Sequence, residues 1–539
     1  MRKILIFIVV LFIISDAKIA DASSLLSTLN TNLSNKFHHG ILPYRLNEKE
    51  QQLAKFYEKN NFKPQWVTST GPTIAVSAIL ETVKKADNEG LEPKDYLKKI
   101  SKIEKLTNPP YSIESLNELE ILVSELAMDY IDDLFGERLT PKKISPLLYI
   151  NPSSIDASDI LYKGNNNDPS GEWFKNLTIN RPDYQFLKKM LEYYRSLQML
   201  NNWAIINSPK SFKEFQKNPS LVAQLQTNLK QHKIYQGTVN GHFDTETENA
   251  LLAFQKIYGQ ETDGILGSET LKALNTPPEE RIKQIIVTME RWRWFPHDIG
   301  EQYLIVNIAG FILVGYKDHK ETLRMPIIIG QKLRKTPVFS STIFEIRFNP
   351  TWYVPHSIAV KDKLPLLRRD PASMIKKGYT IRDHNGNSVD PLQINWSQVD
   401  AEEFPFSLTQ APGSLNALGR IFFNIQSPFG IFLHDTPDTA LFSKAKRNFS
   451  SGCIRVSKPI ELALFILQNN GHINSDLIQE KINSNKTTNI HLSFPIPVHI
   501  TYLTVWFDKE GNYHFSDDIY GLDQTIWEAL QRRTQTLLR

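Results

Sequence analysis

Cys453 is the only cysteine among the 539 residues of this chain, so no disulfide within the chain can hold its fold together. Hydrophobic residues make up 41% of the sequence, which is typical of a globular protein. A chain of this length is expected to divide into about two to four domains, with ample apolar core for folding without cross-links. The sequence therefore predicts a multidomain protein that is stabilised by packing and keeps one thiol unpaired.

The N-terminus has the pattern of an export signal. Arg2 and Lys3 precede an apolar run over 4–14, and Ala20-Asp21-Ala22 offers a small-x-small cleavage site. The run is shorter than the ~20 apolar residues that span a bilayer, although a retained N-terminal anchor is the alternative interpretation. We expect a signal peptide over 1–22 and an exported chain with no membrane span after its removal. In an exported protein, a lone cysteine indicates an intermolecular bridge or a thiol kept for chemistry.

Residues 23–205 are predicted to form a helical scaffold domain. Apolar residues recur at helical spacing over 74–86, 116–134 and 184–200. The aromatic and leucine positions fit an apolar stripe that packs into a core, and no catalytic motif is visible in this part of the chain. A supporting role is the expectation here.

Residues 214–276 predict a compact unit of three short helices. The expected helices are 221–230, 246–258 and 268–275, with Asp244 and Ser268 suited to N-cap positions. The pattern Gly241-His242-Phe243-Asp244, Phe254-Gln255 and Asp263-Gly264-Ile265-Leu266-Gly267 resembles the peptidoglycan-binding domain attached to many bacterial wall enzymes. The resemblance implies a wall-binding unit, without assigning its binding residues.

A junction and a β-rich region follow. Arg291-Trp292-Arg293-Trp294-Phe295-Pro296 ends a helix that begins near Pro278, and Pro296 stops that helix. Alternating aromatic and basic residues also suit a membrane or nucleic-acid surface, but we expect them to pack against the next domain. Short β-rich runs then predict a mixed sheet or barrel within 300–470. These runs are 303–308, 311–316, 322–329, 341–348, 420–424 and 430–434.

The β-rich region is interrupted by an insert over about 356–412. It contains an expected helix over 360–367 and a polar loop at Asp383-His384-Asn385-Gly386-Asn387. An insert of this size within a β domain usually forms a lid or a wall for the substrate. With a C-terminal segment over 471–539, the fold class is multidomain α+β: a helical scaffold, a small three-helix unit and a β-rich domain with a lid-like insert.

Cys453 and His434 are the candidate catalytic pair. His434 ends an apolar strand, and Cys453 follows 19 positions later in Ser450-Ser451-Gly452-Cys453-Ile454-Arg455, before an expected helix that Ser457 could cap. Gly452 permits a tight turn that could aim the amide hydrogens of Gly452 and Cys453 at one point beside the sulfur. Together these are the parts of acyl transfer: a thiolate formed at neutral pH by an imidazole, and an oxyanion hole.

Other interpretations of these residues remain open at this point. A lone cysteine is often a small buried hydrophobe, and His356 is the second candidate for the base. One cysteine and scattered histidines give no zinc spacing, and no Walker or G-x-G-x-x-G sequence is present, so neither a metal nor a cofactor is expected. A net charge of +4 with scattered Lys and Arg argues against nucleic acid as a partner.

The sequence His434-Asp435-Thr436-Pro437 followed by Ser450-Ser451-Gly452-Cys453-Ile454-Arg455 resembles the active-site signature of the L,D-transpeptidases with a YkuD-type catalytic domain. The domain order and Asp517-Asp518-Ile519-Tyr520-Gly521 are similar to the large YcbB-like branch. Many smaller members carry a histidine where this chain has Ser451, which leaves His434 as the only base within the motif.

The resemblance implies a cysteine enzyme that forms 3→3 peptidoglycan cross-links from tetrapeptide stems, with release of D-alanine. It assigns Cys453 as the nucleophile and His434 as the base, with the Gly452 and Cys453 amides as the oxyanion hole. Arg455 would bind a stem carboxylate or support the loop, as would Ser451. Trp352 and Tyr353 could line the cleft, and a core role for Trp352 is equally open.

The acceptor of the acyl group stays open in the sequence. Water would make the protein a carboxypeptidase, a lipoprotein lysine an anchoring enzyme, and a D-amino acid an exchange enzyme, while a non-catalytic wall-binding scaffold is the alternative of a different class. The expected partners are peptidoglycan stem peptides and cell-wall synthases, and the expected location is the periplasm or the cell wall. The resemblance also implies that a carbapenem-type β-lactam traps the thiolate.

Overall fold

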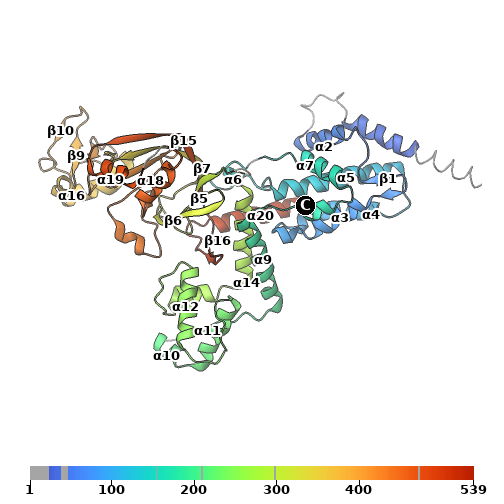
Figure 1. The fold of residues 1–539 in the computed structure, drawn as a ribbon, viewed down its shortest axis with the longest axis horizontal. Coiled ribbons are helices and arrows are strands. Elements are labelled where there is room, and N and C mark those ends of the chain that lie inside the picture. Colours follow the sequence, from blue (N-terminus) through green and yellow to red (C-terminus); the bar gives the residue numbers. More distant parts are fainter. Residues whose placement is uncertain (1–23, 38–46, 153, 208–210, 297–298, 471–473) are drawn as a thin grey trace, which may run out of the picture.

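The computed structural model describes residues 24–37, 47–152, 154–207, 211–296, 299–470 and 474–539 (Figure 1). The signal peptide expected over 1–22 lies outside the described residues. Within the described ranges, no helix combines the length and the apolar character needed to cross a bilayer. Figure 1 shows an elongated molecule, with the helical N-terminal region at one end, the β-rich region at the other, and the three-helix unit below their junction.

The N-terminal region is mainly helical and has its own core. Three predicted helical windows correspond to helices of the structure, α3 (Ile74–Lys84), α5 (Ile113–Leu134) and α9 (Pro182–Leu200). Further helices of this region are α2 (Glu48–Lys59), α4 (Leu97–Leu106) and α7 (Ala157–Asn167). Trp66 lies fully buried in the core of this region, and its indole donates to Ser124 Oγ at 2.7 Å. The helices bury apolar faces against one another, which is why a supporting scaffold is a stable solution for this pattern.

Helix α14 (Pro278–Arg293) forms the junction between the helical N-terminal region and the β-rich region, and it packs along α9. Its C-terminal aromatic and basic residues are buried, so they are packing residues and not an exposed surface. Arg293 and Glu290 form a fully buried ion pair at 3.0 Å. Arg293 also donates to Tyr184 Oη at 2.8 Å, which links α14 to α9. A buried pair of this kind has both charges held by hydrogen bonds, as burial requires.

The three-helix unit consists of α11 (Pro219–Gln231), α12 (Thr245–Ile257) and α13 (Ser268–Leu274), after the short α10 (Phe212–Gln216). Asp244 caps α12 as predicted, because its carboxylate accepts the Thr247 amide at 2.9 Å. Ser268 does not cap α13. The N-cap is Gly267, whose backbone is extended and which has no side chain to bond the first turn, so Ser268 is already helical.

The β-rich region is built on one large sheet that closes on itself. Its strand order is β12-β13-β14-β6-β5-β4-β15-β7-β3, and β12 also pairs with β7. The strands β4 to β7 are Gln302–Asn307, Ile312–Lys317, Lys320–Ile328 and Val338–Phe348. The others are β3 (Leu148–Tyr149), β12 (Ile421–Ile425), β13 (Leu433–His434), β14 (Ile454–Val456) and β15 (Thr488–Thr501). The closed sheet encloses the largest apolar core of the protein, as the predicted barrel requires.

Strand β15 was not predicted from the sequence, although it lies between β4 and β7 in the sheet. It belongs to the segment over 471–539 that was expected to follow the catalytic domain. Its Pro495 and Pro497 are residues that normally exclude a central strand, because proline cannot donate to the ladder. The pairing with β7 shifts register between His491 and Ile496, so the irregularity accommodates Pro495.

The insert forms a small subdomain with its own apolar core. Its sheet has the order β10-β9-β11-β8. The strands are β8 (Trp352–Tyr353), β9 (Tyr379–Arg382), β10 (Ser388–Val389) and β11 (Ser407–Gln410). The helical elements are α15 (His356–Ile358), the π-helical turn η4 (Ala359–Lys363), α16 (Leu364–Arg369) and α17 (Ala372–Lys376). The predicted helix over 360–367 is thus split between η4 and α16.

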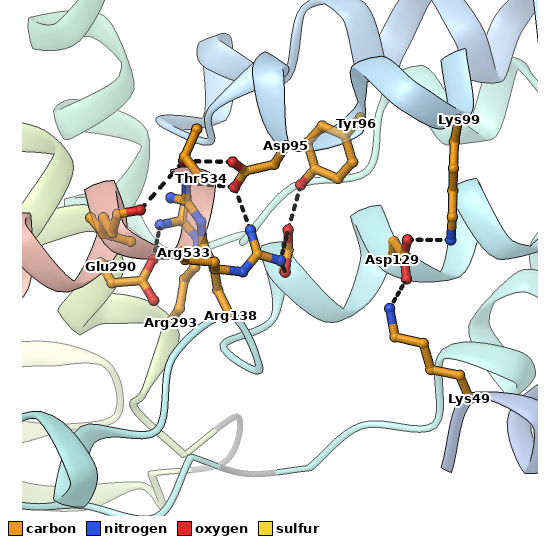
Figure 2. Close-up of polar contacts among 12 residues, drawn as sticks. Lys49, Asp95, Tyr96, Lys99, Asp129, Arg138, Glu290, Arg293, Arg533 and Thr534 are labelled. Carbon is orange, nitrogen blue, oxygen red and sulfur yellow. Dashed lines mark hydrogen bonds and ion pairs between the residues drawn. The ribbon is translucent and has the colours of Figure 1, made fainter. Parts of the chain in front are cut away.

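Helix α20 (Leu522–Leu538) leads from the β-rich region back to the helical region, where the C-terminus lies (Figure 1). Figure 2 shows its Arg533 and Thr534 beside Asp95 and Arg138 of the helical region. Arg533 Nη2 lies 2.6 Å from Asp133 Oδ1, and Thr534 Oγ1 donates to Asp95 at 2.6 Å. The end of the chain therefore ties the two ends of the molecule together.

Candidate active site

His434 ends β13, and Cys453 immediately precedes the neighbouring parallel strand β14. In the register of β13 and β14, Leu433 faces Ile454 and His434 faces Arg455, so Cys453 precedes β14 beside Phe432. Leu433 and Ile454 point into the enclosed core, and side chains alternate along a strand. His434 therefore projects from the opposite face of the sheet, whereas Cys453 lies in the bend just before β14 and packs partly against the same core. The strand pairing brings the backbones of the two predicted catalytic residues close to each other.

The insert covers this face of the sheet. Phe432 packs against the apolar core of the insert and lies against Phe422 in a tilted arrangement, with ring centroids 4.5 Å apart. The Phe432 ring also lies 5.7 Å from the imidazole of His434. His434 is consequently buried, at 5% exposure. The predicted insert thus forms a wall of the candidate site.

The imidazole of His434 is held by backbone carbonyls. Nδ1 lies 2.5 Å from the carbonyl oxygen of Asp435, which assigns the ring hydrogen to Nδ1 and leaves the lone pair on Nε2. The Asp435 carboxylate accepts the amides of Arg420 and Thr436, both at 2.7 Å, and so fixes the backbone at this position. The ring is therefore oriented by the main chain and not by a carboxylate.

Burial, together with the positive charge of Arg455, lowers the pKa of His434 to about 3. The carbonyls of Asp435 and Leu418 act in the opposite direction, because they stabilise an imidazolium. At neutral pH the ring is neutral and able to accept a proton. The same two carbonyls would stabilise the charge that forms on it.

The thiol of Cys453 is protonated in the resting structure. Burial raises its pKa to about 11, and the backbone of Phe432 and the charge of Arg455 offset this only in part. The sulfur lies 3.9 Å from the carbonyl oxygen of Gly430, and no hydrogen bond joins it to His434, although both residues are described. The raised pKa of the thiol and the lowered pKa of His434 both oppose the thiolate expected at neutral pH, because desolvation disfavours both charges of a thiolate–imidazolium pair.

A pH profile of thiol alkylation tests this state. We expect the rate of iodoacetamide labelling at Cys453 to rise about tenfold for each pH unit between pH 7 and pH 10, because only the thiolate reacts. The raised pKa means that the thiolate fraction is small at pH 7 and grows until the pH approaches 11. Intact-mass spectrometry measures the rate, with Cys453→Ala as the control. A rate that is already at its plateau near neutral pH would instead reveal a preformed thiolate.

The loop before Cys453 is held in a strained but well-bonded conformation. Gly452 has φ of +121°, a region that favours glycine. Its carbonyl accepts a hydrogen bond from Thr336 Oγ1 at 2.7 Å, and its amide donates to Ser450 Oγ at 3.1 Å. The amide of Cys453 has no recorded partner. Of the two predicted oxyanion donors, only the Cys453 amide is free at rest.

The C-terminal segment also stabilises the loop that precedes Cys453. The hydroxyl of the buried Tyr520 donates to the carbonyl of Gly330 and accepts the amide of Thr336 at 3.2 Å. Thr336 in turn holds the Gly452 carbonyl. Sequence reasoning noted the motif around Tyr520 only as a resemblance. Its contact with a loop 184 residues earlier in the chain has no short-range signal.

Arg334 connects the catalytic loop to the insert. Its guanidinium donates to Ser451 Oγ at 2.7 Å and forms two bonds to the carboxylate of Asp362, at 2.5 and 2.7 Å. Asp362 lies in η4, within the insert. A bidentate pair of this type fixes direction as well as distance. The predicted Ser451 therefore acts here as an anchor between loop and insert, and Arg334 and Asp362 are site residues that the sequence did not reveal.

Arg455 lies on the same face of the sheet as His434. Its Nη1 lies 3.3 Å from Asp438 Oδ2 and 3.5 Å from Thr436 Oγ1, which are long contacts. Its Nε is buried and has no hydrogen-bond partner. A guanidinium has five donor hydrogens, so Arg455 keeps donors for another group.

The other predicted residues lie in the insert. Trp352 is buried in the insert core beside Tyr379, with ring centroids 6.2 Å apart, whereas Tyr353 is 73% exposed. His356, the second candidate for the base, is exposed and has its ring 6.2 Å from Phe404. Neither Trp352 nor His356 has a recorded contact with Cys453 or His434.

The segment after Cys453 differs from the prediction. Strand β14 follows at once, and α18 (Pro459–Leu467) begins only beyond it. The N-cap of α18 is Lys458, and Ser457 makes no cap because its hydroxyl is buried without a partner. The pairing of β14 with β13 is what brings the backbone of Cys453 close to that of His434.

The loop between His434 and Cys453 contacts the three-helix unit. The amide of Ala445 donates to Glu261 at 3.1 Å, and Lys446 forms an ion pair with Glu269.

In the described part of the chain, no cluster of three or more His, Cys, Asp or Glu side chains could hold a metal ion.

Comparisons with known families assign the parts of the chain. Residues 301–481 match the YkuD model, described as the L,D-transpeptidase catalytic domain. Residues 51–191 match a model described as a scaffold domain, and residues 218–274 match the "Putative peptidoglycan binding domain". The first of these matches contains β13, β14 and both candidate catalytic residues.

Two curated relatives match parts of the chain. A Haemophilus influenzae protein named "Putative L,D-transpeptidase" is 35% identical over 238 residues, which are 43% of this chain and 48% of the relative. The N-acetylmuramoyl-L-alanine amidase CwlM of Mycobacterium tuberculosis is 49% identical over 53 residues, 10% of this chain and 13% of that protein. The chain thus spans less than half the length of either relative.

Solved L,D-transpeptidase structures are more distant. The enzyme from Stackebrandtia nassauensis is 14% identical with a TM-score of 0.22, over 55% of this chain and 95% of that one. A mutant of the Enterococcus faecium enzyme is 13% identical with a TM-score of 0.19, over 38% and 50% of the two chains. These scores are too low to support an argument. The sequence matches are what relates the chain to known families: residues 301–481 are similar to the L,D-transpeptidase catalytic domain of the YkuD model, and the regions before them are similar to a scaffold domain and a peptidoglycan-binding domain.

Proposed function

We propose that this protein is a cysteine L,D-transpeptidase that forms 3→3 cross-links between peptidoglycan stem peptides through a thioester on Cys453. The observation that carries the proposal is the pairing of β13 with β14 inside the matched region, which brings the backbones of His434 and Cys453 close to each other. The peptidoglycan-binding domain supports a cell-wall substrate. Both features are consistent with a protein that acts outside the cytoplasm, in the periplasm or the wall.

The first step is acylation of Cys453. The sulfur attacks the carbonyl carbon of the L-centre of the diamino acid at position three of a tetrapeptide stem, while the thiol proton moves to Nε2 of His434. The resting pKa values disfavour a preformed ion pair, so proton transfer accompanies the attack. The bond between that carbon and the D-alanine nitrogen then breaks, and the imidazolium returns the proton to the departing amine. The products are the thioester and free D-alanine.

The second step transfers the acyl group to another stem. The side-chain amine of an acceptor stem attacks the thioester carbon, and His434 receives a proton from that amine. The carbon–sulfur bond breaks, the thiolate is reprotonated by the imidazolium, and an amide joins the two stems. Division of one amide exchange into two acyl transfers replaces a difficult step with two easier ones.

The oxyanion of each tetrahedral intermediate needs hydrogen-bond donors. The Cys453 amide has no competing partner and is the first donor that we assign. The Gly452 amide serves as the second donor only if it exchanges Ser450 Oγ for the substrate oxygen. Such donors stabilise charge that develops in the transition state and are worth about 10²- to 10³-fold in rate.

Product analysis tests the proposal. The protein is incubated with purified tetrapeptide muropeptides, and the products are separated and weighed by mass spectrometry beside a Cys453→Ala control. The expected result is release of D-alanine together with new dimeric muropeptides, both lost in Cys453→Ala. Tripeptides without dimers would replace the transpeptidase with an L,D-carboxypeptidase, and modification of a lipoprotein lysine would make it an anchoring enzyme. Absence of any product, with retained binding to sacculi, would leave a non-catalytic wall-binding scaffold.

A further inference from the structure

Lys363 is a half-buried lysine with no acidic partner. It ends the π-helical turn η4 of the insert, and its ammonium lies 5.2 Å from the ring centroid of Trp352 and 5.0 Å from that of Tyr379. The structure records no hydrogen bond or ion pair for its Nζ with any described residue. Aromatic faces attract a cation, but they leave its three donor hydrogens without acceptors. The lysine is therefore held in place with its hydrogen-bonding capacity unused.

The acidic residues near Lys363 already have other partners. Asp362 forms the bidentate pair with Arg334, and Asp438 lies 3.3 Å from Arg455. Burial lowers the pKa of Lys363, and the positive charges of Lys377 and Arg455 lower it further, while Asp362 and Asp438 raise it. The ammonium of Lys363 is therefore repelled by two other cations. An anion placed among these groups would relieve this repulsion.

The position of Lys363 relative to the catalytic pair is fixed by its neighbours. Its preceding residue, Asp362, is bonded through Arg334 to Ser451, two positions before Cys453. The core that contains Trp352 and Tyr379 also covers Phe432, next to His434. The ammonium of Lys363 also interacts electrostatically with Arg455 and Asp438, so Lys363 lies on the side of the insert that is near Arg455.

Arg455 offers unused donors on that side. Its Nη2 has no recorded hydrogen bond, and its buried Nε has no partner. A lysine and an arginine with free donors, held by two separate elements, form a site for a carboxylate. The arginine supplies planar, directional bonds, and the lysine supplies a compact charge.

We propose that Lys363 and Arg455 bind the terminal carboxylate of the donor stem, which belongs to the D-amino acid that leaves. This inference rests on the proposed function and extends it to donor selection. One residue separates the scissile carbonyl from that carboxylate, so a group that acylates Cys453 carries its terminal carboxylate close to the same side of the insert. The two cations then select stems that end one residue beyond the attacked carbonyl.

A donor with its terminal carboxylate converted to an amide tests the clamp directly. Binding of the tetrapeptide acid and of the tetrapeptide amide is measured by calorimetry on Cys453→Ala, in which turnover cannot interfere. We expect Lys363→Met to weaken binding of the acid by roughly tenfold or more and to leave binding of the amide unchanged, because one charge-assisted contact is removed. Lys363→Arg is expected to restore most of the preference, and Lys361→Met, at an exposed lysine on the same turn, to keep it fully.

The same comparison in turnover separates this inference from the proposed function. With Cys453 present, Lys363→Met should raise KM for the acid and change kcat much less. The proposed carboxylate site would be wrong if the protein with Lys363 intact bound the acid and the amide equally well. It would also be wrong if Lys363→Met weakened binding of the acid and of the amide by the same factor. If the protein released D-alanine from both donors in those cases, the proposed function would stand without the clamp. If turnover failed but the acid preference persisted in binding, the clamp would stand and the reaction would need replacement.

Discussion

His434→Gln is expected to slow acylation of Cys453 by about 10²- to 10⁴-fold, which is the contribution of a positioned general base. Glutamine can keep a hydrogen bond to the Asp435 carbonyl but cannot accept the thiol proton. Because the Cys453 thiol is protonated at rest, with a pKa of about 11, the reaction depends on a group that removes this proton during the attack. Single-turnover release of D-alanine, followed by mass spectrometry, measures the step.

His356→Gln is the matched control for this prediction. His356 was the second candidate for the base in the sequence, and the structure places it exposed in the insert, against Phe404. We expect its substitution to change acylation by less than about twofold, as for a surface substitution. Thermal unfolding of both variants checks that the buried site is intact. A large loss in His356→Gln with little change in His434→Gln would transfer the role of base to the insert.

Arg533→Ala is expected to lower the free energy of unfolding by about 3 kcal/mol, the lower end of the cost of breaking a buried ion pair, because Arg138 remains as a second cation beside Asp95 and Asp133. Figure 2 shows the cluster in which Arg533 of α20 meets Asp95 of the helical region. The side chains of Asp95 and Asp133 are 1% and 5% exposed, and Arg533 contacts both. Burial raises the pKa of Asp133 despite the attraction of Arg533, so loss of the arginine leaves a charge that is costly to keep buried.

Arg532→Ala is the matched control, one residue earlier on the same helix. Its side chain is 65% exposed and lies 3.8 Å from Glu528, so we expect a change within about 0.5 kcal/mol. Urea denaturation, followed by hydrogen exchange in α5 and α20, compares the two variants. Equal stability of both would mean that the contact between α20 and the helical region contributes little. A loss of stability in Arg533→Ala but not in Arg532→Ala would confirm that the contact between α20 and the helical region stabilises the protein.

Local patterns in the sequence predicted much of the helical architecture. Helical spacing located α3, α5 and α9, and Asp244 marked the start of α12, because amphipathic spacing and capping depend on neighbours a few residues apart. Ser268 and Ser457 were wrong as caps, since glycine or lysine occupies the N-cap position in each case. The choice between adjacent cap residues depends on backbone geometry that residue type alone does not specify.

Long-range pairing limited the prediction of the sheet. Strand β15 was missed because its two prolines oppose a central strand, and only the register shift in its pairing with β7 explains how it fits. Its place between β4 and β7 depends on residues nearly two hundred positions earlier in the chain, which no local pattern encodes.

In the candidate site, too, local motifs were predictable from the sequence and long-range contacts were not. Cys453 and His434 were predicted from a compact motif, and the parallel pairing of β13 with β14 brings their backbones close to each other. Arg334, Asp362 and Lys363 were missed, since their relation to Cys453 arises from the packing of the insert and from contacts across 117 residues of sequence. The protonated thiol was also missed, because desolvation depends on burial that the sequence does not show.

The central claim is that Cys453 carries the acyl group, and intact-mass spectrometry of the protein during turnover tests it most directly. The protein is mixed with a tetrapeptide stem, quenched in acid within the first turnover, and mapped by peptide digestion. We predict an adduct of the stem minus D-alanine on the peptide that contains Cys453, which disappears when an acceptor amine is added and is absent in Cys453→Ala. Cross-linked products formed by Cys453→Ala, or turnover of the protein without any adduct at this residue, would contradict the account.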